Sequence, residues 1–401
     1  MKQGSSTVLC FLDSYRVWGG GQLVSLSNAS GLARRGFTVF LGARRGLALY
    51  QAAEKLLQKE PELRPRLRLF DFSIGNLDFL NPFKILSLAR FLRREGVNIL
   101  KASLPRDLKV AVMAARLLPP AKRPALYYRR DIAIPVRPGW LNRFFYGALD
   151  GLVVNSRETA RNVLESGRLI PPGKVHLIYN GLETEEFDRA LAACPVPPAP
   201  PFQNQADRPL VIGIAGRLSP QKAQKYLLHL SAALKRQGLR HRLIIAGTGQ
   251  LKAELAELAA RLGLEAGEGL DSDRELCFAG FLEDMAPFWR AIDVFVLSSL
   301  WEGFGYVLAE AMLAEKPVCA FNCNSMPELV LDGQNGCLAE APGPGEADEA
   351  VGGRLAETIR RFYAEPESLS RLGRAGRAFC LENFTQDRAL DQLMSVMGLA
   401  D

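Results

Sequence analysis

Residues 298–317 read SSLWEGFGYVLAEAMLAEKP. The apolar run just before them, residues 294–297, predicts a buried strand. Gly303 and Gly305 predict a turn, and residues 306–314 have helical composition up to the breaker Pro317. A strand, a glycine turn and a helix in this order favour an anion site, because the first N–H groups of a helix lack intrahelical partners.

Two carboxylates, Glu302 and Glu310, flank this turn with seven residues between them. Wholly helical spacing would separate them by about 80° of rotation and about 12 Å of rise. They would then suit two hydroxyl-bearing parts of one long ligand. The alternative is that Glu302 caps the helix and Glu310 is solvated. However, Glu310 lies among Val, Leu, Ala and Met, where a carboxylate needs a partner.

A second strand-turn-helix pattern lies at residues 210–222 and contains Gly216, Arg217 and Lys222. An arginine fork grips phosphate oxygens and a lysine adds a point charge. The pattern therefore predicts a phosphate site, and ordinary surface cations are the alternative.

Together these motifs resemble the E-x7-E signature and phosphate-binding pair of the retaining glycosyltransferases of family 4, which have the GT-B fold. The resemblance covers nearly the whole chain and is most specific over residues 210–338. It implies that Glu302 meets the donor sugar and Glu310 the nucleotide ribose. It also implies that Arg217 and Lys222 neutralise the donor diphosphate. One departure is Ala223, where the family usually has glycine.

The resemblance implies further donor-binding residues in the second half of the chain. The Gly247 and Gly249 turn would line the nucleotide pocket, and the backbone of Phe281 and Leu282 would contact the base. For Phe281, a place in the core is an equal alternative. The full donor-binding set is Gly216, Arg217, Lys222, Gly247, Gly249, Phe281, Leu282, Glu302, Gly303, Phe304, Gly305 and Glu310.

No metal and no cofactor is expected. Asp271 and Asp273 form a D-x-D, but they lie in a polar loop before a strand, not at a strand's carboxyl end. The seven cysteines and three histidines are scattered without zinc-site spacing. Arg217, Lys222 and the helix N-terminus would therefore stabilise the leaving diphosphate.

The first half of the chain begins with a βαβ pattern. A strand at residues 7–13 leads into Gly19, Gly20 and Gly21, and residues 22–35 predict a helix. The glycines do not form G-x-G-x-x-G, which disfavours a nicotinamide-dependent dehydrogenase. They allow close backbone approach to a ligand, with a plain flexible loop as the alternative.

The first half also holds the main departure from the family. Many members carry a histidine after the fifth strand, near the donor sugar, whereas this chain has Arg130 and Asp131 there. Asp131 is a candidate catalytic base. The other candidate catalytic residues are Glu302, Arg217 and Lys222. A role as a salt-bridge partner among the neighbouring arginines is the preferred alternative for Asp131.

The charge of the chain is asymmetric. Residues 1–190 hold 30 Lys and Arg against 16 Asp and Glu, a balance of +14, whereas the remainder holds 20 against 27, a balance of −7. The basic half favours an anionic membrane surface or an anionic glycan or glycolipid acceptor, and no nucleic-acid partner is expected. Solvated arginines are the alternative. The candidate acceptor-binding residues are Arg16, Trp18, Gly19, Gly20, Arg106 and Arg130.

The predicted fold class is α/β, with two Rossmann-like doubly wound domains, and the resemblance implies the GT-B arrangement in which they face each other across a cleft. The first domain spans residues 1–190, a proline-rich linker spans 191–208 and the donor domain spans 209–384. The resemblance also implies that a helix at 385–401 crosses back to the first domain. No apolar run reaches about 18 residues and the start lacks a signal-peptide core. We therefore expect a cytoplasmic protein, with peripheral contact at the inner membrane face.

The resemblance to family 4 implies a metal-independent retaining glycosyltransferase. It would move a sugar from a nucleotide diphosphate to a glycan or glycolipid, such as a lipopolysaccharide core or a lipid-linked or cell-surface polysaccharide. A sugar-phosphate or sucrose-type synthase with a soluble acceptor is the nearest alternative. A nucleotide-sugar epimerase of the same fold and a non-catalytic sugar-nucleotide-binding subunit are the others.

Overall fold

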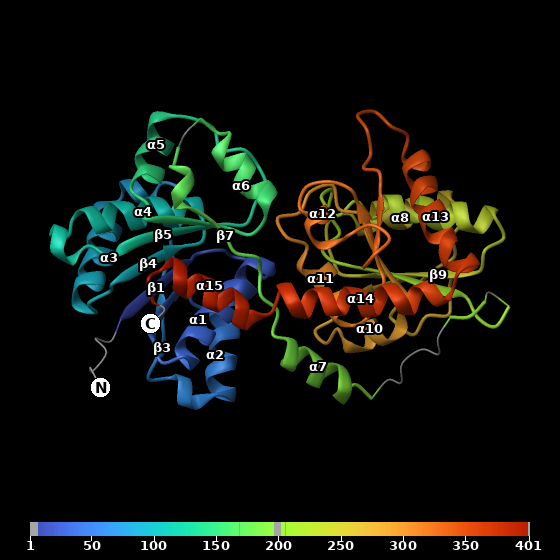
Figure 1. Ribbon diagram of the computed structural model, residues 1–401, viewed down its shortest axis with the longest axis horizontal. Helices are drawn as coiled ribbons and strands as arrows, with labels where there is room; N and C mark the ends of the chain where they lie inside the picture. Colours follow the sequence, from blue (N-terminus) through green and yellow to red (C-terminus); the bar gives the residue numbers. More distant parts are fainter. Residues whose placement is uncertain (1–6, 168, 196–201, 205, 400–401) are drawn as a thin grey trace. The chain divides into compact units, whose positions relative to one another are not determined.

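The computed structural model describes residues 7–167, 169–195, 202–204 and 206–399. The chain divides into two compact units, the first made of Met1–Gly181 with Gln386–Asp401 and the second of Leu182–Thr385. Each unit holds one seven-stranded parallel sheet with helices packed on it (Figure 1). The predicted α/β class with two doubly wound units is confirmed.

The strands of the first unit are β1 (Val8–Asp13), β2 (Thr38–Ala43), β3 (Leu67–Asp71), β4 (Ile99–Ala102), β5 (Ala125–Arg130), β6 (Gly151–Val154) and β7 (Val175–Leu177). The helices are α1 (Gly20–Arg34), α2 (Ala48–Lys59), α3 (Pro82–Arg94), α4 (Pro105–Arg116), α5 (Trp140–Gly147), α6 (Arg157–Leu164) and α15 (Gln386–Val396). Short 3-10 turns are η1 (Pro61–Leu63), η2 (Asp78–Leu80), η3 (Pro120–Lys122) and η4 (Pro172–Lys174).

The strand order of the first sheet is β3-β2-β1-β4-β5-β6-β7. The order reverses between β1 and β4, and a crevice at such a reversal, beyond the carboxyl ends of the strands, is the usual ligand site of a doubly wound sheet. Apolar side chains from both faces of the sheet are buried under helices, as a parallel sheet requires.

The last helix, α15, belongs to the first unit, where it packs beside α1 (Figure 1). A β-carbon at Gly31 of α1 would lie 2.4 Å from the side chain of Leu390, so only glycine permits this close approach. Arg35 pairs with Asp387 and Asp391 at the edge of the contact. Leu390 and Leu393 complete the core beneath α1.

The second unit contains β8 (Leu210–Ala215), β9 (His241–Ala246), β10 (Ala266–Glu268), β11 (Leu276–Gly280), β12 (Val294–Leu297), β13 (Val318–Phe321) and β14 (Cys337–Ala339). Its helices are α7 (Thr184–Ala193), α8 (Lys225–Arg236), α9 (Lys252–Arg261), α10 (Ala286–Ala291), α11 (Tyr306–Leu313), α12 (Met326–Leu329), α13 (Asp348–Ala364) and α14 (Glu367–Asn383). The strand order is β10-β11-β9-β8-β12-β13-β14, so here the reversal lies between β8 and β12.

The division between the units differs from the predicted boundary at residue 190. Helix α7 belongs to the second unit, because Asp188 pairs with Arg377 (2.6 Å) and Arg290 donates to the Leu191 carbonyl. The prediction followed the proline run instead. Of that linker, residues 196–201 and 205 lie outside the described residues, as do residues 400–401 of the predicted segment 385–401.

The strands predicted at residues 7–13, before Gly216 and at residues 294–297 are observed as β1, β8 and β12, whereas two short edge strands were missed. β10 and β14 have three residues each, too few for a pattern, and β10 overlaps the predicted polar loop. Among the described helices, none is long and apolar enough to cross a lipid bilayer.

Candidate active site

Two loops of the second unit meet at the reversal of its strand order. One follows β8 and carries Lys222, and the other follows β12 and carries Glu302. Lys222 Nζ donates to Glu302 Oε1 at 2.6 Å, with only 15% and 11% of the two side chains exposed. The fold therefore brings together a cation and a carboxylate that are 80 residues apart in sequence. Arg217 is exposed on the β8 loop.

Hydrogen bonds hold the two loops against each other. Ser298 Oγ donates to the Lys222 carbonyl (2.8 Å), and the Leu300 amide donates to the Gln221 carbonyl (2.8 Å). Ser325 Oγ donates to the Glu302 carbonyl (3.1 Å). The ion pair thus rests on a fixed backbone, which favours preorganised charge at this end of the sheet.

Ala223 lies at a position where the backbone adopts a conformation that favours glycine. Its φ of +45° lies in the left-handed region, and the residue is buried. An L-residue with a side chain pays roughly 1–2 kcal/mol for this conformation, whereas glycine adopts it readily. Ala223 therefore holds a backbone conformation that glycine would adopt without strain.

Helix α11 begins directly beyond Gly305, whose left-handed φ of +84° turns the chain into the helix. No side chain caps this end. A β-carbon on Gly305 would lie 2.7 Å from Met326 Cε, the flexible end of a side chain, so the positive φ is the main reason for glycine here. Phe304, one of the predicted donor-binding residues, buries its ring against Phe384, which leaves only its backbone for a ligand.

Glu310 lies one turn into α11 and is partly buried. Its carboxylate makes no hydrogen bond or ion pair within the described part of the chain. Burial raises the pKa of Glu310 to about 7. The pKa of Tyr306 is raised well above its usual value, first by the burial of its own side chain and then by the charge of Glu310. A partly buried carboxylate without a partner among the described residues is suited to a ligand hydroxyl.

The packing of two loops within the protein explains why glycine occupies positions 247 and 249. A β-carbon at Gly247 would lie 2.0 Å from the Gly216 carbonyl oxygen, and one at Gly249 would lie 2.2 Å from that of Leu218. The two glycines therefore let the β9 loop pack on the β8 loop. Phe281 is 71% exposed just after β11, so the alternative that places it in the core is wrong.

In the first unit, the fold brings Asp131 beside the glycine turn that starts α1. A β-carbon at Gly21 would lie 3.8 Å from Asp131 Oδ2. Asp131 also pairs with the buried Arg129 (2.9 Å), which in turn donates to Asn180 Oδ1. These contacts give Asp131 the salt-bridge partner that the sequence analysis preferred, at a position close to the glycines.

The candidate acceptor residues do not all lie together. Strand alternation puts Arg130 on the face of β5 opposite Arg129, where its guanidinium donates to the Ile134 carbonyl. Arg106 is anchored to Ser14 at the carboxyl end of β1, close to the exposed Arg16 and Trp18. The sequence analysis missed Arg44, although it directly follows β2 and therefore lies at the same sheet edge.

Among the residues with described positions, no group of three or more His, Cys, Asp or Glu side chains is placed to hold a metal ion.

Comparison with known proteins gives a consistent result. The family model for glycosyl transferases group 1 matches residues 209–357, and that for glycosyltransferase family 4 matches residues 18–186. The Bacillus subtilis putative glycosyltransferase EpsD is 28% identical, and a Streptomyces bingchenggensis D-inositol 3-phosphate glycosyltransferase is 34% identical. These matches cover 69% and 61% of this chain but only 65% and 51% of the relatives.

Solved structures match over almost the whole chain. Anabaena HepE in complex with UDP and glucose is 22% identical with a TM-score of 0.75, covering 98% of this chain and 99% of that one. A glycosyltransferase from Rickettsia africae is 17% identical with a TM-score of 0.76, covering 98% of each. These likenesses confirm the GT-B fold. Because the two family models together span most of both units, the chain belongs to glycosyltransferase family 4.

Proposed function

We propose that the protein is a retaining glycosyltransferase that moves a sugar from a nucleotide diphosphate to a glycan or glycolipid acceptor without a metal ion. The observation that carries the proposal is the Lys222–Glu302 pair at the strand-order reversal of the second unit, next to the N-terminus of α11. The HepE structures contain UDP and UDP-glucose, which makes a uridine diphosphate sugar the first donor to test.

In this proposal the site residues divide the work between the diphosphate, the sugar and the ribose of the donor. Arg217, Lys222 and the start of α11 stabilise the negative charge that develops on the leaving diphosphate. Glu302 holds Lys222 and accepts a hydrogen bond from a donor-sugar hydroxyl, and Glu310 accepts one from the ribose. The bond from the sugar anomeric carbon to the phosphate oxygen breaks, and a bond to the acceptor oxygen forms on the same face. The acceptor proton passes to the leaving diphosphate.

Asp131 has two possible tasks, and its ion pair with Arg129 supports the positioning one. The buried guanidinium of Arg129 occupies the carboxylate of Asp131 and fixes its position. We therefore propose that Asp131 fixes the glycine turn at the start of α1 and does not accept the proton.

The second candidate is a synthase that uses a small phosphorylated acceptor. The names of two relatives favour it: the D-inositol 3-phosphate glycosyltransferase and an α-maltose-1-phosphate synthase from Mycolicibacterium smegmatis, which is 28% identical. The match covers 64% of this chain and 65% of the synthase. Transfer to a soluble acceptor in the absence of lipid would favour this candidate.

A nucleotide-sugar panel tests the proposal. We expect one donor to raise the melting temperature of the wild type, and Arg217→Ala to lose at least tenfold in donor affinity because its charged fork is gone. Arg261→Ala, an exposed arginine at the end of α9, is the control and is expected to bind like the wild type. If no nucleotide sugar stabilises the wild type, the transferase proposal fails and a non-catalytic role takes its place.

We further propose that the first unit docks on anionic membranes through the start of α3. Leu77, Leu80, Phe83 and Leu86 are exposed there, with Phe83 80% accessible, and Arg90 and Arg93 are exposed on the same helix. Apolar side chains beside cations suit the interface of an anionic bilayer.

Vesicle sedimentation tests this docking. Phe83→Ser is expected to weaken binding to vesicles that contain anionic lipid by roughly tenfold, because one buried aromatic ring contributes about 1.5–3 kcal/mol. Raising the salt to about 0.5 M should weaken binding further. Leu117→Ser, at an exposed leucine after α4, is the control. Binding that ignores Phe83, salt and anionic lipid would contradict the proposal.

A further inference from the structure

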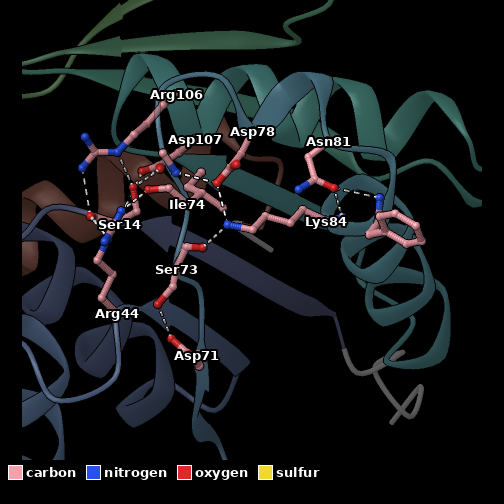
Figure 2. Close-up of polar contacts among 12 residues, drawn as sticks. Ser14, Arg44, Asp71, Ser73, Ile74, Asp78, Asn81, Lys84, Arg106 and Asp107 are labelled. Atoms are coloured by element: carbon pink, nitrogen blue, oxygen red, sulfur yellow. Dashed lines mark hydrogen bonds and ion pairs between the residues drawn. The ribbon is translucent and has the colours of Figure 1, made fainter.

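Two arginines converge at the strand-order reversal of the first unit. Arg44 directly follows β2, and Arg106 lies in the first turn of α4. Arg44 Nε (3.1 Å) and Arg106 Nη2 (2.9 Å) both donate to the carbonyl oxygen of Ser14, which directly follows β1. Arg106 Nε also donates to Ser14 Oγ (2.7 Å) (Figure 2). One neutral oxygen thus holds two guanidinium groups side by side.

Neither guanidinium forms an ion pair with a carboxylate within the described chain. Asp107 lies beneath them, but it is fully buried and accepts hydrogen bonds from the amide and hydroxyl of Ser14. Burial raises the pKa of Asp107 to about 8, whereas its hydrogen bonds from Ser14 act in the opposite direction. Asp78, the next carboxylate, forms an ion pair with Lys84 (2.6 Å) (Figure 2). It also accepts a hydrogen bond from the Gly75 amide.

The electrostatic environment of Arg44 reflects the neighbouring arginines. Its pKa is lowered first by burial and then by the charges of Arg16 and Arg106, and the charges of Asp107 and Asp78 offset part of this effect. A bound dianion would screen the repulsion between like charges held this close. The cluster therefore has the electrostatics of an anion site.

The free hydrogen-bond donors define the chemistry of the anion. Nη2 of Arg44 is used by the Ile74 carbonyl, whereas Nη1 of Arg44 and Nη1 of Arg106 make no hydrogen bond to described residues. These two Nη1 groups and an exposed third arginine, Arg16, suit a group with two negative charges and several acceptor oxygens. A phosphate monoester has these properties.

We propose that Arg44 and Arg106, with Arg16 beside them, bind the phosphoryl group of a phosphorylated acceptor at the reversal between β1 and β4. The proposal rests on the proposed function only in assigning the phosphate to the acceptor. Arg44 is then a specificity residue, because its positive charge favours phosphorylated acceptors over their uncharged counterparts. The group can come from a soluble sugar phosphate or from a lipid headgroup.

Phosphate binding is measured in the Arg217→Ala/Lys222→Ala background, which removes the donor-phosphate cations of the second unit. We expect inorganic phosphate to raise the melting temperature by roughly 3 °C at ten times its dissociation constant, relative to chloride at equal ionic strength. Adding Arg44→Gln and Arg106→Gln should abolish this rise. Arg45→Gln, an exposed neighbour that lies over the Tyr50 ring, should leave it unchanged.

A purely structural role for the arginines gives a different result. Loss of the Ser14 contacts alone would lower the melting temperature equally in phosphate and chloride, with the phosphate-dependent rise retained, and would overturn the proposal. So would an equal loss in Arg45→Gln. If the double glutamine variant does not fold, Arg44→Lys and Arg106→Lys keep the charge but not the fork, and each should weaken phosphate binding at least threefold.

Two further arms identify the source and separate this inference from the proposed function. Glucose 6-phosphate protecting better than inorganic phosphate supports a soluble acceptor, whereas Arg106-dependent binding to phosphatidic acid vesicles supports a lipid. Nucleotide-sugar binding, measured with Lys222 and Arg217 intact, should be unchanged by Arg44→Gln. Donor binding without phosphate binding overturns only this inference; phosphate binding without donor binding overturns only the transferase proposal.

Discussion

Lys222→Met is expected to lower the rate of sugar transfer by about 10²–10³, because it removes a preorganised positive charge from the leaving diphosphate. Glu302→Gln should lower the rate by a comparable factor. Lys222 Nζ and Glu302 Oε1 lie 2.6 Å apart and are mostly buried, so the carboxylate fixes the ammonium where charge develops. The readout is release of nucleotide from the donor that the panel identifies, with water or the acceptor as the second substrate.

The pairing itself is tested by a double-mutant cycle. Because the two side chains act as a unit, the Lys222→Met/Glu302→Gln variant should be little slower than either single variant. Lys225→Met is the matched control: it breaks a 2.7 Å pair with Asp348 that is far more exposed, and it should change the rate by less than twofold. Rate losses that multiply in the double variant would show that Lys222 and Glu302 act independently.

Glu310→Gln is expected to stabilise the free protein above pH 7 while it weakens donor binding. The folded-state pKa of Glu310 is about 7 against an ordinary 4.5, because burial disfavours its charge. The folded state therefore holds a proton that the unfolded state has already lost between these values, so wild-type stability falls as the pH rises from about 4.5 to 7. At pH 8 the variant should gain up to about 3 kcal/mol, and at pH 4 almost nothing.

Urea unfolding at pH 4 and pH 8, together with donor titration, checks this prediction. Donor affinity should fall roughly tenfold in Glu310→Gln, because an amide oxygen is a weaker acceptor for a ribose hydroxyl than a carboxylate. Glu340→Gln, an exposed glutamate after β14, should change stability by less than about 0.5 kcal/mol at either pH. A variant that is less stable at pH 8 would show that Glu310 has a partner in the free protein.

Several features of the site could be predicted because their signals are local in the sequence. The strand at β12, the glycine turn and helix α11 follow from the apolar run, Gly303, Gly305 and the helical composition after them. The same holds for Arg217 and Lys222, which follow a strand that a run of six buried residues defines. The apolar neighbours of Glu310 in the sequence also predicted a carboxylate that needs a partner.

Other features could not be predicted because they depend on which strands become neighbours. Lys222 meets Glu302 only because β8 pairs with β12, and Arg44 meets Arg106 only because β1 lies between β2 and β4. The sequence indicated a core or a site for Phe281, and only packing decided that it is exposed.

The sequence by itself determined the two βαβ series and the residues that carry charge at their strand ends, since hydrophobic periodicity and glycine turns act over a few residues. The tertiary structure decided which of those charges became partners. It pairs Lys222 with Glu302, pairs Asp131 with Arg129, and brings Arg44 and Arg106 to one carbonyl oxygen without an ion pair to a described carboxylate. The physical reason is that ion pairing depends on distances of a few ångströms, which strand order and loop packing set across many residues of chain.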